Sequence, residues 1–269
     1  MNLYERDYSI STKEEDILRE EVIARNTVSL GRIKPKNSKY FFEQPKVFRH
    51  KESLFPNNYL DIVELYEYEK LSKINQAFNE TLENTKTTES DIQRFIKSNK
   101  AYHLIGSLLK LYNFGHHSAY LFPEFQLGTS FKADYLLVGK SSDGFSFVFV
   151  ELESPYGNIF MKNGDFGESA RKGINQIEDW KSFIQRDFST ISSELKKYTK
   201  AQLTDEFYNY DATRCNYVVV VGRRKDFNDK SYELSRKKSK ESNIIVTHYD
   251  KIYDLSENLI INGSGALTY

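Results

Sequence analysis

The sequence has little cysteine and histidine: Cys215 is the single cysteine among 269 residues, and there are five histidines. One thiol can form neither an internal disulfide nor a thiolate zinc cluster, and the histidines show no HExxH or HxH spacing, so zinc chemistry is not expected. No apolar run approaches the roughly 18 residues of a membrane helix, and "MNLYERDYSI" lacks the basic start and apolar centre of a secretory signal. We therefore expect a cytoplasmic protein without a membrane partner.

An excess of charge is also missing, because 38 Lys and Arg balance 38 Asp and Glu. No long-range field draws nucleic acid to the chain, so any contact with it must come from local patches. One such patch is "RRKDFNDKSYELSRKKSK" (223–240), although a solvated helix surface explains it equally. Hydrophobic residues make up 39% and charged residues 28%, which indicates a globular chain able to bury one large core or two modest ones.

The character of the sequence changes near residue 85. Before it, "EVIARNTVSLGRI" (21–33) and "YFFEQPKVFRHKESLF" (40–55) look like strands, and a more helical stretch follows over 59–82. We predict a small N-terminal α+β domain over residues 1–85, with an accessory or regulatory role. The polar run "ENTKTTES" (83–90) would link it to a second domain over residues 86–269.

The second domain begins with a helical signal. Thr88 and Asp91 fit a capping box, and apolar residues continue after them at helical spacing, which predicts a helix or a pair of helices. Three strand-like segments come next: "AYLFPEFQL" (119–127), "ADYLLVG" (133–139) and "FSFVFVELE" (145–153). The turn residues "KSSDG" join the last two, so the three segments form an antiparallel meander.

The remainder of the chain alternates helix and strand. Residues 168–188 carry an apolar stripe at helical spacing, "NYVVVVG" (216–222) and "NIIVTH" (243–248) read as two buried strands, and a closing helix follows. The order β-β-β-α-β-β-α predicts an α/β fold with a mixed β-sheet flanked by helices.

Three carboxylates lie at the ends of predicted strands. In "FSFVFVELE" both faces are apolar until Glu151 and Glu153, which share one face and lie about 7 Å apart along the strand. Asp134 begins the preceding strand, and paired strands lie about 4.8 Å apart, so the three acids can converge on one side of the sheet. An unpaired buried carboxylate costs several kcal/mol or takes up a proton. Either a divalent cation compensates these charges, or the acids are solvated strand ends.

The donor types indicate which cation would fit. Hard oxygen ligands without thiolate or clustered imidazole favour Mg²⁺ or Mn²⁺ over zinc. The candidate metal ligands are Asp134, Glu151, the main-chain carbonyl of Leu152, and Glu124 on the strand before Asp134.

The spacing of Asp134, sixteen residues, Glu151, one residue and Glu153, on a hairpin between helices, resembles the PD-(D/E)XK nuclease core. Four blocks occur in the order "EFQLGTSFKADYLLV", "FVFVELESP", "GINQIEDWKSFI" and "VVVVGRR". They are similar to the nuclease domain of the Shedu antiphage defence family, over roughly residues 88–262. The resemblance implies a restriction-endonuclease-like sheet, DNA as partner and a homo-oligomer. It also implies that Asp134 and Glu151 bind Mg²⁺, which activates water for attack on a phosphodiester.

Glu153 departs from the common pattern, because the nuclease superfamily usually has lysine at this position. A lysine orients water and offsets negative charge, whereas Glu153 would act as a general base, hold a second metal about 3.5–4 Å from the first, or mark an inactive site. Gln176 on the following helix, with Trp180 one turn later, would face the same site as a positioning group. An ordinary amide on a helix surface explains Gln176 as well.

Four basic residues are candidates for DNA contact. The resemblance includes Arg223 and Arg224, which follow a buried strand and suit phosphate because guanidinium offers a bidentate fork. Asp226 or Asp229 could instead pair with them inside the molecule. The other two candidates, which would meet the DNA backbone from the start of the Gln176 helix, are Lys172 and Arg171.

The leading hypothesis is a divalent-metal-dependent DNA endonuclease of antiviral defence, with the catalytic residues Asp134, Glu151, Glu153 and Gln176. The alternative is a catalytically inactive module with the same fold, which binds nucleic acid or assembles a defence complex. A third hypothesis is a protein-interaction domain with solvated acids and no DNA affinity. Dependence on metal separates the first from the second, and retention on DNA that falls as salt rises argues against the third.

Overall fold

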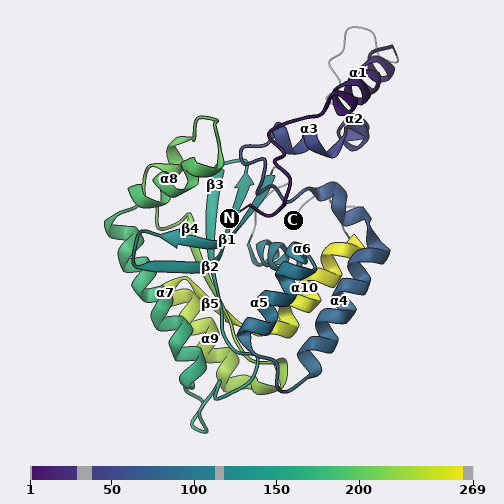
Figure 1. Cartoon of the computed structure of the whole chain (residues 1–269). Helices are drawn as coiled ribbons and strands as arrows, with labels where there is room; N and C mark the ends of the chain where they lie inside the picture. The colour runs from purple at the N-terminus through teal and green to yellow at the C-terminus, as the bar shows by residue number, and fades with distance from the viewer. Residues whose placement is uncertain (1, 29–37, 113–117, 263–268) are drawn as a thin grey trace.

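The computed structural model describes residues 2–28, 38–112, 118–262 and 269. Its centre is a five-stranded sheet with the order β1-β2-β3-β4-β5 (Figure 1). The strands are β1 (Ser118–Leu127), β2 (Phe131–Ser141), β3 (Gly144–Leu152), β4 (Cys215–Val220) and β5 (Ile244–Thr247). The first three are antiparallel, and β3, β4 and β5 are parallel. The predicted mixed sheet flanked by helices is confirmed.

The helices are α1 (Lys13–Val28), α2 (Ser38–Glu43), α3 (Lys46–Lys51), α4 (Tyr68–Glu83), α5 (Glu89–Ser98), α6 (Tyr102–Gly106), α7 (Glu168–Arg186), α8 (Ser189–Leu195), α9 (Asp229–Ser242) and α10 (Tyr249–Asn262). In Figure 1, α7, α8 and α9 lie on one side of the sheet, and α4, α5, α6 and α10 lie on the other. In the part of the chain that the structure describes, every helix is too short or too polar to cross a membrane.

The central strand β3 is buried on both faces, as its sequence predicts. Phe147 and Phe149 belong to the core that includes Trp180 of α7. Val148 and Val150 belong to the second core, on the side of α5 and α10. Because Trp180 is fully buried, its replacement by alanine is expected to cost about 3–5 kcal/mol of unfolding free energy.

Helix α5 begins at the predicted capping box. The Thr88 hydroxyl accepts a hydrogen bond from the amide of Asp91, and the Asp91 carboxylate accepts one from the amide of Thr88. Ile92 and Ile96 bury one face of the helix. At the other end Lys100 adopts a φ of 50°, which turns the chain toward α6. This defined start and stop fix α5 beside the end of β2.

Most described residues of the two strand segments predicted in the N-terminal region are helical. Helix α1 covers residues 21–28 of the first segment, whose residues 29–33 lie outside the described part, and α2 and α3 cover most of 40–51. In the described residues of this region the sheet pairing is limited to an isolated bridge at Tyr59, so the strands predicted within 21–28 and 40–55 were wrong. Aromatic and β-branched residues favour strands only weakly, and here packing decides: Val47 and Phe48 are buried from a helix.

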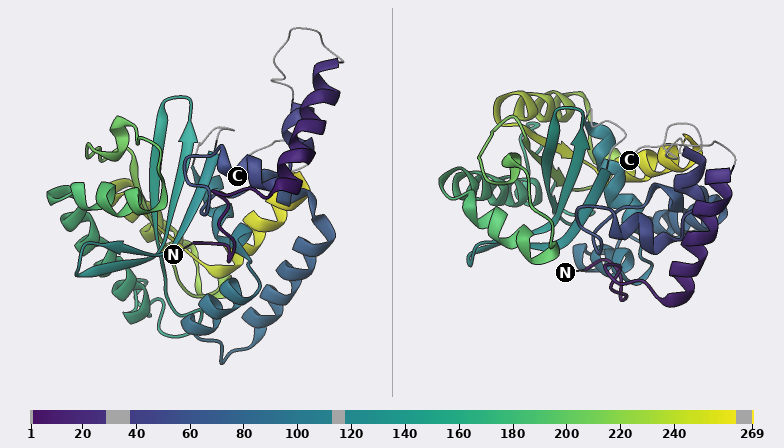
Figure 2. Two further views of the ribbon diagram at one scale, coloured as in Figure 1. Left: turned by 45° about the horizontal axis from the view of Figure 1, so that its top comes forward. Right: turned by 90° about the horizontal axis from the view of Figure 1, so that it is seen from above.

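The N-terminal region contributes to both cores of the sheet domain. Helix α4 runs beside α10 (Figure 1, Figure 2), and Leu71 and Phe78 of α4 join the core on that side. Phe55 joins the core on the α7 side, and Tyr59 forms a bridge with Tyr120 at the start of β1. The division of the chain at residues 85 and 86 stays a prediction.

Helix α9 was missing from the predicted order of elements. It connects β4 to β5, which are parallel, and parallel neighbours need a crossover connection. The basic segment 223–240 supplies this helix: Lys238 pairs with Glu178 of α7, and Lys237 pairs with Glu241. Most of the segment is therefore a helix surface with local ion pairs.

Candidate active site

The strand pairing ends where the predicted carboxylates begin. Between β2 and β3 the last paired residues are Tyr135 and Val150, so Asp134 and Glu151 are the next residues along the two antiparallel strands. The Asp134 Oδ2 atom accepts a hydrogen bond of 2.7 Å from the amide of Leu152. The Leu152 amide thus donates to a side-chain carboxylate and not to a main-chain carbonyl of β2. This hydrogen bond holds the Asp134 side chain against β3.

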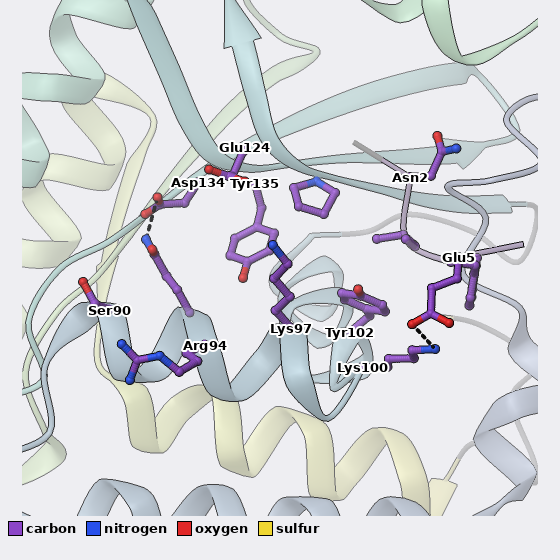
Figure 3. Close-up of a pocket in the computed structure, with 14 residues that line it drawn as sticks. Asn2, Glu5, Ser90, Arg94, Lys97, Lys100, Tyr102, Glu124, Asp134 and Tyr135 are labelled. Atoms are coloured by element: carbon purple, nitrogen blue, oxygen red, sulfur yellow. Dashed lines mark hydrogen bonds and ion pairs between the residues drawn. The ribbon is translucent and has the colours of Figure 1, made fainter.

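The pairing between β1 and β2 is interrupted at the same level, because the register passes over Glu124 and Asp134. Glu124 has a φ of 49°, in the left-handed region that costs a residue with a side chain about 1–3 kcal/mol. As a result Phe122 and Phe125, three residues apart, pack in the same core. The Glu124 carboxylate pairs with Lys132 at 2.6 Å, and Figure 3 shows Glu124 beside Asp134.

The carboxylates are buried and incompletely satisfied. Glu151 is 4% exposed and Glu153 is 2% exposed. Among the described residues, Glu151 Oε2 and Glu153 Oε1 have no hydrogen-bond partner. Burial, together with the charges of Asp134 and Glu153, raises the pKa of Glu151. Burial also raises the pKa of Asp134, although the Leu152 amide opposes this. The cluster therefore favours a proton or a cation.

Lys172 of α7 brings a cation to this cluster. Its Nζ atom lies 2.9 Å from Glu153 Oε2 and 3.8 Å from Glu89 Oε2. Burial acts to lower the pKa of Lys172, but the hydrogen bond and charge of Glu153 raise it overall, so the ammonium form is retained. The Lys172 side chain is 60% exposed and open to a substrate.

Gly173 explains how α7 comes so close to the acids. A Cβ atom at this position would lie 2.8 Å from Val219 Cγ1 and 2.9 Å from Glu153 Cγ, closer than packed atoms allow. Any side chain here would move the helix away from β3 and β4 or displace Glu153. The absence of a side chain at Gly173 therefore sets the reach of Lys172.

Helix α5 contributes two residues that the sequence interpretation missed. Gln93 donates a hydrogen bond of 2.8 Å to Asp134 Oδ1, and the charge of Glu89 raises the pKa of both Asp134 and Glu151. Glu89 and Gln93 are four residues apart and share one face of α5. That spacing, directly after a capping box, was the available signal.

A third missed residue is Tyr249 of α10. Its hydroxyl donates a hydrogen bond of 2.6 Å to the main-chain oxygen of Glu153. The contact holds the chain directly after β3. Gln176, a predicted positioning group, is half-buried one turn after Lys172, and its side chain has no hydrogen bond with another described residue. Its role stays a prediction.

This arrangement coincides with a known family. A family model described as Shedu protein SduA, C-terminal, matches residues 86–253. The chain belongs to the Shedu SduA family. Membership of this family suggests a part in antiphage defence. A search of curated proteins finds no match. The matched residues run from just before α5 into α10 and include the carboxylates and Lys172.

Arg223 of this Shedu protein is engaged inside the molecule. Its guanidinium donates to Asp250 at 3.0 and 2.8 Å and to Glu83 at 2.7 Å. It also donates to the carbonyl of Leu82 and to the hydroxyl of Tyr156. Arg223 is 6% exposed and has a partner at each of its three nitrogens. It ties the end of β4 to α4 and α10, and this leaves it no free edge for phosphate.

The other predicted DNA contacts are more accessible. Arg224 is exposed and pairs with Asp254 of α10. Asp226, which the sequence offered as an alternative partner, accepts a hydrogen bond from the main-chain amide of Arg223. Arg171 is exposed at the start of α7, next to Lys172. Contact of these residues with DNA stays a prediction.

A cavity of about 420 Å³ opens beside Asp134 (Figure 3). Its walls are the N-terminal segment 2–5, α5, Tyr102 at the start of α6, and the interrupted ends of β1 and β2. The basic residues that line it are Arg94, Lys97 and Lys100. Asp134 is therefore reached from a cleft whose walls carry both basic and acidic side chains, the acids being Glu5, Glu124 and Asp134 itself.

The donor set permits a divalent cation that keeps part of its water shell. Among the described residues, no group of three or more His, Cys, Asp or Glu side chains is arranged to hold a metal ion. Mg²⁺, however, usually keeps several waters and is bound through one or two carboxylates plus substrate phosphates. Asp134 and Glu151 offer such a pair, and the unpartnered Oε2 atom of Glu151 suits a cation ligand.

Proposed function

We propose that this Shedu family protein is a divalent-metal-dependent DNA endonuclease of antiviral defence, which hydrolyses phosphodiester bonds. The observation that carries the proposal is a pair of acids on adjacent strands: Asp134 is half-buried and lines an open cavity, and Glu151 is buried with an unpartnered oxygen. The pKa of both is raised. Buried acids are normally paired, and strongly perturbed acids in a cleft mark functional sites. A divalent cation would offset both charges.

The residues that would hold Mg²⁺ or Mn²⁺ are Asp134, Glu151 and the carbonyl of Leu152, with Glu124 at the side of the cavity. When bound, such a cation lowers the pKa of a bound water and neutralises charge on phosphoryl oxygens. The protein orients the first ligand, because Gln93 donates to one oxygen of Asp134 and the Leu152 amide donates to the other. Asp134 is thus positioned before the cation arrives.

Glu153 and Lys172 would divide the work that a motif lysine does alone. Glu153 can accept a proton from the attacking water, since one of its oxygens has no partner. Lys172 holds the other oxygen and presents an exposed ammonium group, which can stabilise negative charge on the phosphate. The lysine function is thereby supplied from α7 and not from β3.

Basic side chains on both sides of the acids would hold the DNA backbone. Lys172 and Arg171 lie at the start of α7, and Lys97 and Arg94 line the cavity on α5. Gln176, one turn after Lys172, would position substrate from the same helix. Such contacts release counterions, so binding should weaken steeply as salt rises.

The test is cleavage of circular and linear duplex DNA by the purified protein in Mg²⁺, in Mn²⁺ and in EDTA. Glu151→Ala is compared with Glu241→Ala, which changes an exposed acid on α9. We expect metal-dependent cutting that Glu151→Ala abolishes and Glu241→Ala retains. Cutting that persists in EDTA or in Glu151→Ala contradicts the proposed site.

A second candidate is a catalytically inactive module that binds nucleic acid or assembles a defence complex. Glu153 at the lysine position favours it, as do the ion pairs that Lys172 already makes with Glu153 and Glu89. Such a module would bind DNA equally in EDTA and in Mg²⁺, with or without Glu151→Ala. It would leave all DNA forms intact.

A further inference from the structure

The cavity beside Asp134 extends away from the acids along α5 (Figure 3), and α5 lies on the opposite side of the sheet from α7 (Figure 1). Its volume, about 420 Å³, lies within the range of sites that enclose small ligands, roughly 300–1,000 Å³. The proposed cleavage reaction uses only the Asp134 end. The remaining space is bounded by residues that take no part in the proposed bond cleavage, although Arg94 and Lys97 were assigned to the DNA backbone.

The walls of this space are suited to a flat ring. Tyr135 of β2 is buried, Tyr102 of α6 is half-buried, and Pro123 precedes the interrupted position in β1. Aromatic and proline rings at the border of a cavity offer stacking surfaces, and every nucleic-acid base has a face that can use them. The lining therefore fits a base without selecting its sequence.

Lys97 supplies a cation in the same space. Figure 3 shows its side chain extending from α5 into the cavity on the side of Tyr135. The Lys97 side chain takes part in no hydrogen bond or ion pair among the described residues, although its charge helps to lower the pKa of Glu124. Arg94, by contrast, pairs with Asp91 at 2.7 Å and Lys100 pairs with Glu5 at 3.6 Å. The ammonium group of Lys97 is therefore available to an anionic ligand.

The acids of the cavity are already engaged by contrast. Glu124 is paired with Lys132, and Asp134 accepts hydrogen bonds from Gln93 and the Leu152 amide. The ammonium group of Lys97 lies beside the rings of Tyr102 and Tyr135, and the acids of the cavity already have partners. This combination favours a ligand with a flat ring and a negatively charged group. A nucleoside monophosphate unit has this composition.

We propose that this cavity binds one nucleotide, with its base against Tyr102 and Tyr135 and its phosphate on Lys97. The nucleotide is either free or part of a DNA strand that continues to Asp134, and the second source rests on the proposed nuclease function. A paired base cannot enter, because its partner and stacked neighbours would have to follow. DNA with an unpaired nucleotide next to the cut is therefore the preferred substrate, since unpairing then costs no free energy at binding.

The test uses the full chain in EDTA, so that binding is measured without cleavage. A blunt duplex is compared with the same duplex carrying a two-nucleotide overhang, and deoxyadenosine monophosphate is titrated separately. The variants are Lys97→Glu, Lys97→Arg and the control Lys240→Glu, which changes an exposed lysine on α9 outside the cavity lining.

We expect the overhang duplex to bind about tenfold more tightly than the blunt duplex, a difference of about 1.4 kcal/mol, because the stacking of one base contributes roughly this much. Lys97→Glu should abolish this preference, and Lys97→Arg and Lys240→Glu should keep it. A preference without binding of the free nucleotide identifies the strand as the source. Nucleotide binding without a preference, also lost in Lys97→Glu, identifies the free nucleotide.

The inference is overturned if the protein shows neither the preference nor nucleotide binding, or if Lys97→Glu changes neither. Cleavage in Mg²⁺ is scored separately on the same proteins. Cutting without a nucleotide site removes this inference alone. A nucleotide site without cutting removes the proposed nuclease function alone.

Discussion

Two groups of charges lie at the ends of neighbouring parallel strands, and they are built in opposite ways. In the carboxylate site, which is Asp134, Glu151 and Glu153, Lys172 pairs with Glu153, and two carboxylate oxygens have no hydrogen-bond partner among the described residues. In the arginine cluster, which is Arg223, Asp250 and Glu83, the buried guanidinium bonds both acids and two further oxygens. The first group is incomplete without a ligand, and the second is complete.

The comparison separates structural charge from functional charge. A buried ion pair whose groups are all hydrogen-bonded holds secondary-structure elements together. Removing one partner leaves the other as an uncompensated charge and destabilises the fold. A buried acid without a compensating partner lowers the stability of the fold. Such acids are typical of functional sites. The arginine cluster should therefore govern stability with little effect on chemistry. The carboxylate site should do the reverse.

The largest effect, on the rate of DNA cleavage, is expected when Lys172, which pairs with Glu153, is changed. Lys172→Ala should lower the rate of DNA cleavage about 100-fold, as loss of one charge-stabilising donor does. The exchange Glu153→Lys with Lys172→Glu returns a lysine to β3 and should recover most of the rate. The measurement is the initial rate of plasmid cleavage in Mg²⁺.

The exchange has a control in the same helix. Lys181→Ala removes another lysine of α7, which pairs with Glu178 away from the acids. If Lys181→Ala lowers the rate as much as Lys172→Ala, or if the exchange is no better than Lys172→Ala alone, Lys172 has no special role in the chemistry.

In the arginine cluster the expected effect is on stability. Arg223→Ala should lower the free energy of unfolding by about 2–3 kcal/mol, because it leaves Asp250 without its buried partner. Arg224→Ala, at the neighbouring exposed ion pair with Asp254, should cost no more than about 1 kcal/mol. Urea unfolding of the three proteins measures the difference, and equal losses would refute the distinction.

The arginine cluster should also give the protein acid sensitivity. Burial acts to raise the pKa of Asp250, but the hydrogen bonds and charge of Arg223 lower it below its ordinary value. A carboxyl whose pKa is lower in the folded chain stabilises at neutral pH, and this contribution is lost as the pH falls through the lowered pKa. Arg223→Ala should therefore show a weaker loss of stability between neutral and acidic pH. A profile parallel to that of wild type would contradict this.

The smallest effect has opposite signs in the two groups. Glu151→Gln should raise the free energy of unfolding by about 1 kcal/mol in EDTA, because the raised pKa means that folding at neutral pH requires Glu151 to take up a proton, and glutamine does not. Asp250→Asn makes the same chemical change in the arginine cluster and should lower it. The two variants unfold in the same urea series, and a shared sign would remove the contrast between the groups.

Local sequence patterns were sufficient for the sheet and for α5. The alternation from Phe145 to Glu153 depends only on neighbours in the chain, and the capping box of Thr88 and Asp91 is formed within four residues. Residues 21–28 and 40–51 have strand-like composition but form helices, because burial against the rest of the molecule decides their state. Propensity could not show that.

The convergence of the carboxylates was foreseeable, and their surroundings were not. Asp134 and Glu151 lie on adjacent strands of one hairpin, so turn and register bring them together. Lys172 and Gln93 reach them only because two helices pack on opposite faces of the sheet. The partners of Arg223 lie 27 and 140 residues away in the chain. The nearby Asp226 and Asp229, which the sequence offered as alternative partners, do not bond the Arg223 side chain.

The most direct test of the contrast is a titration of Mn²⁺ into the metal-free protein, followed calorimetrically for wild type, Glu151→Ala and Arg223→Ala. Because the carboxylate site has oxygens without a partner among the described residues, we expect wild type and folded Arg223→Ala to bind Mn²⁺ saturably. Glu151→Ala should not bind Mn²⁺. If Glu151→Ala binds Mn²⁺ as strongly as wild type, or if wild type does not bind it, Asp134 and Glu151 do not form a metal site.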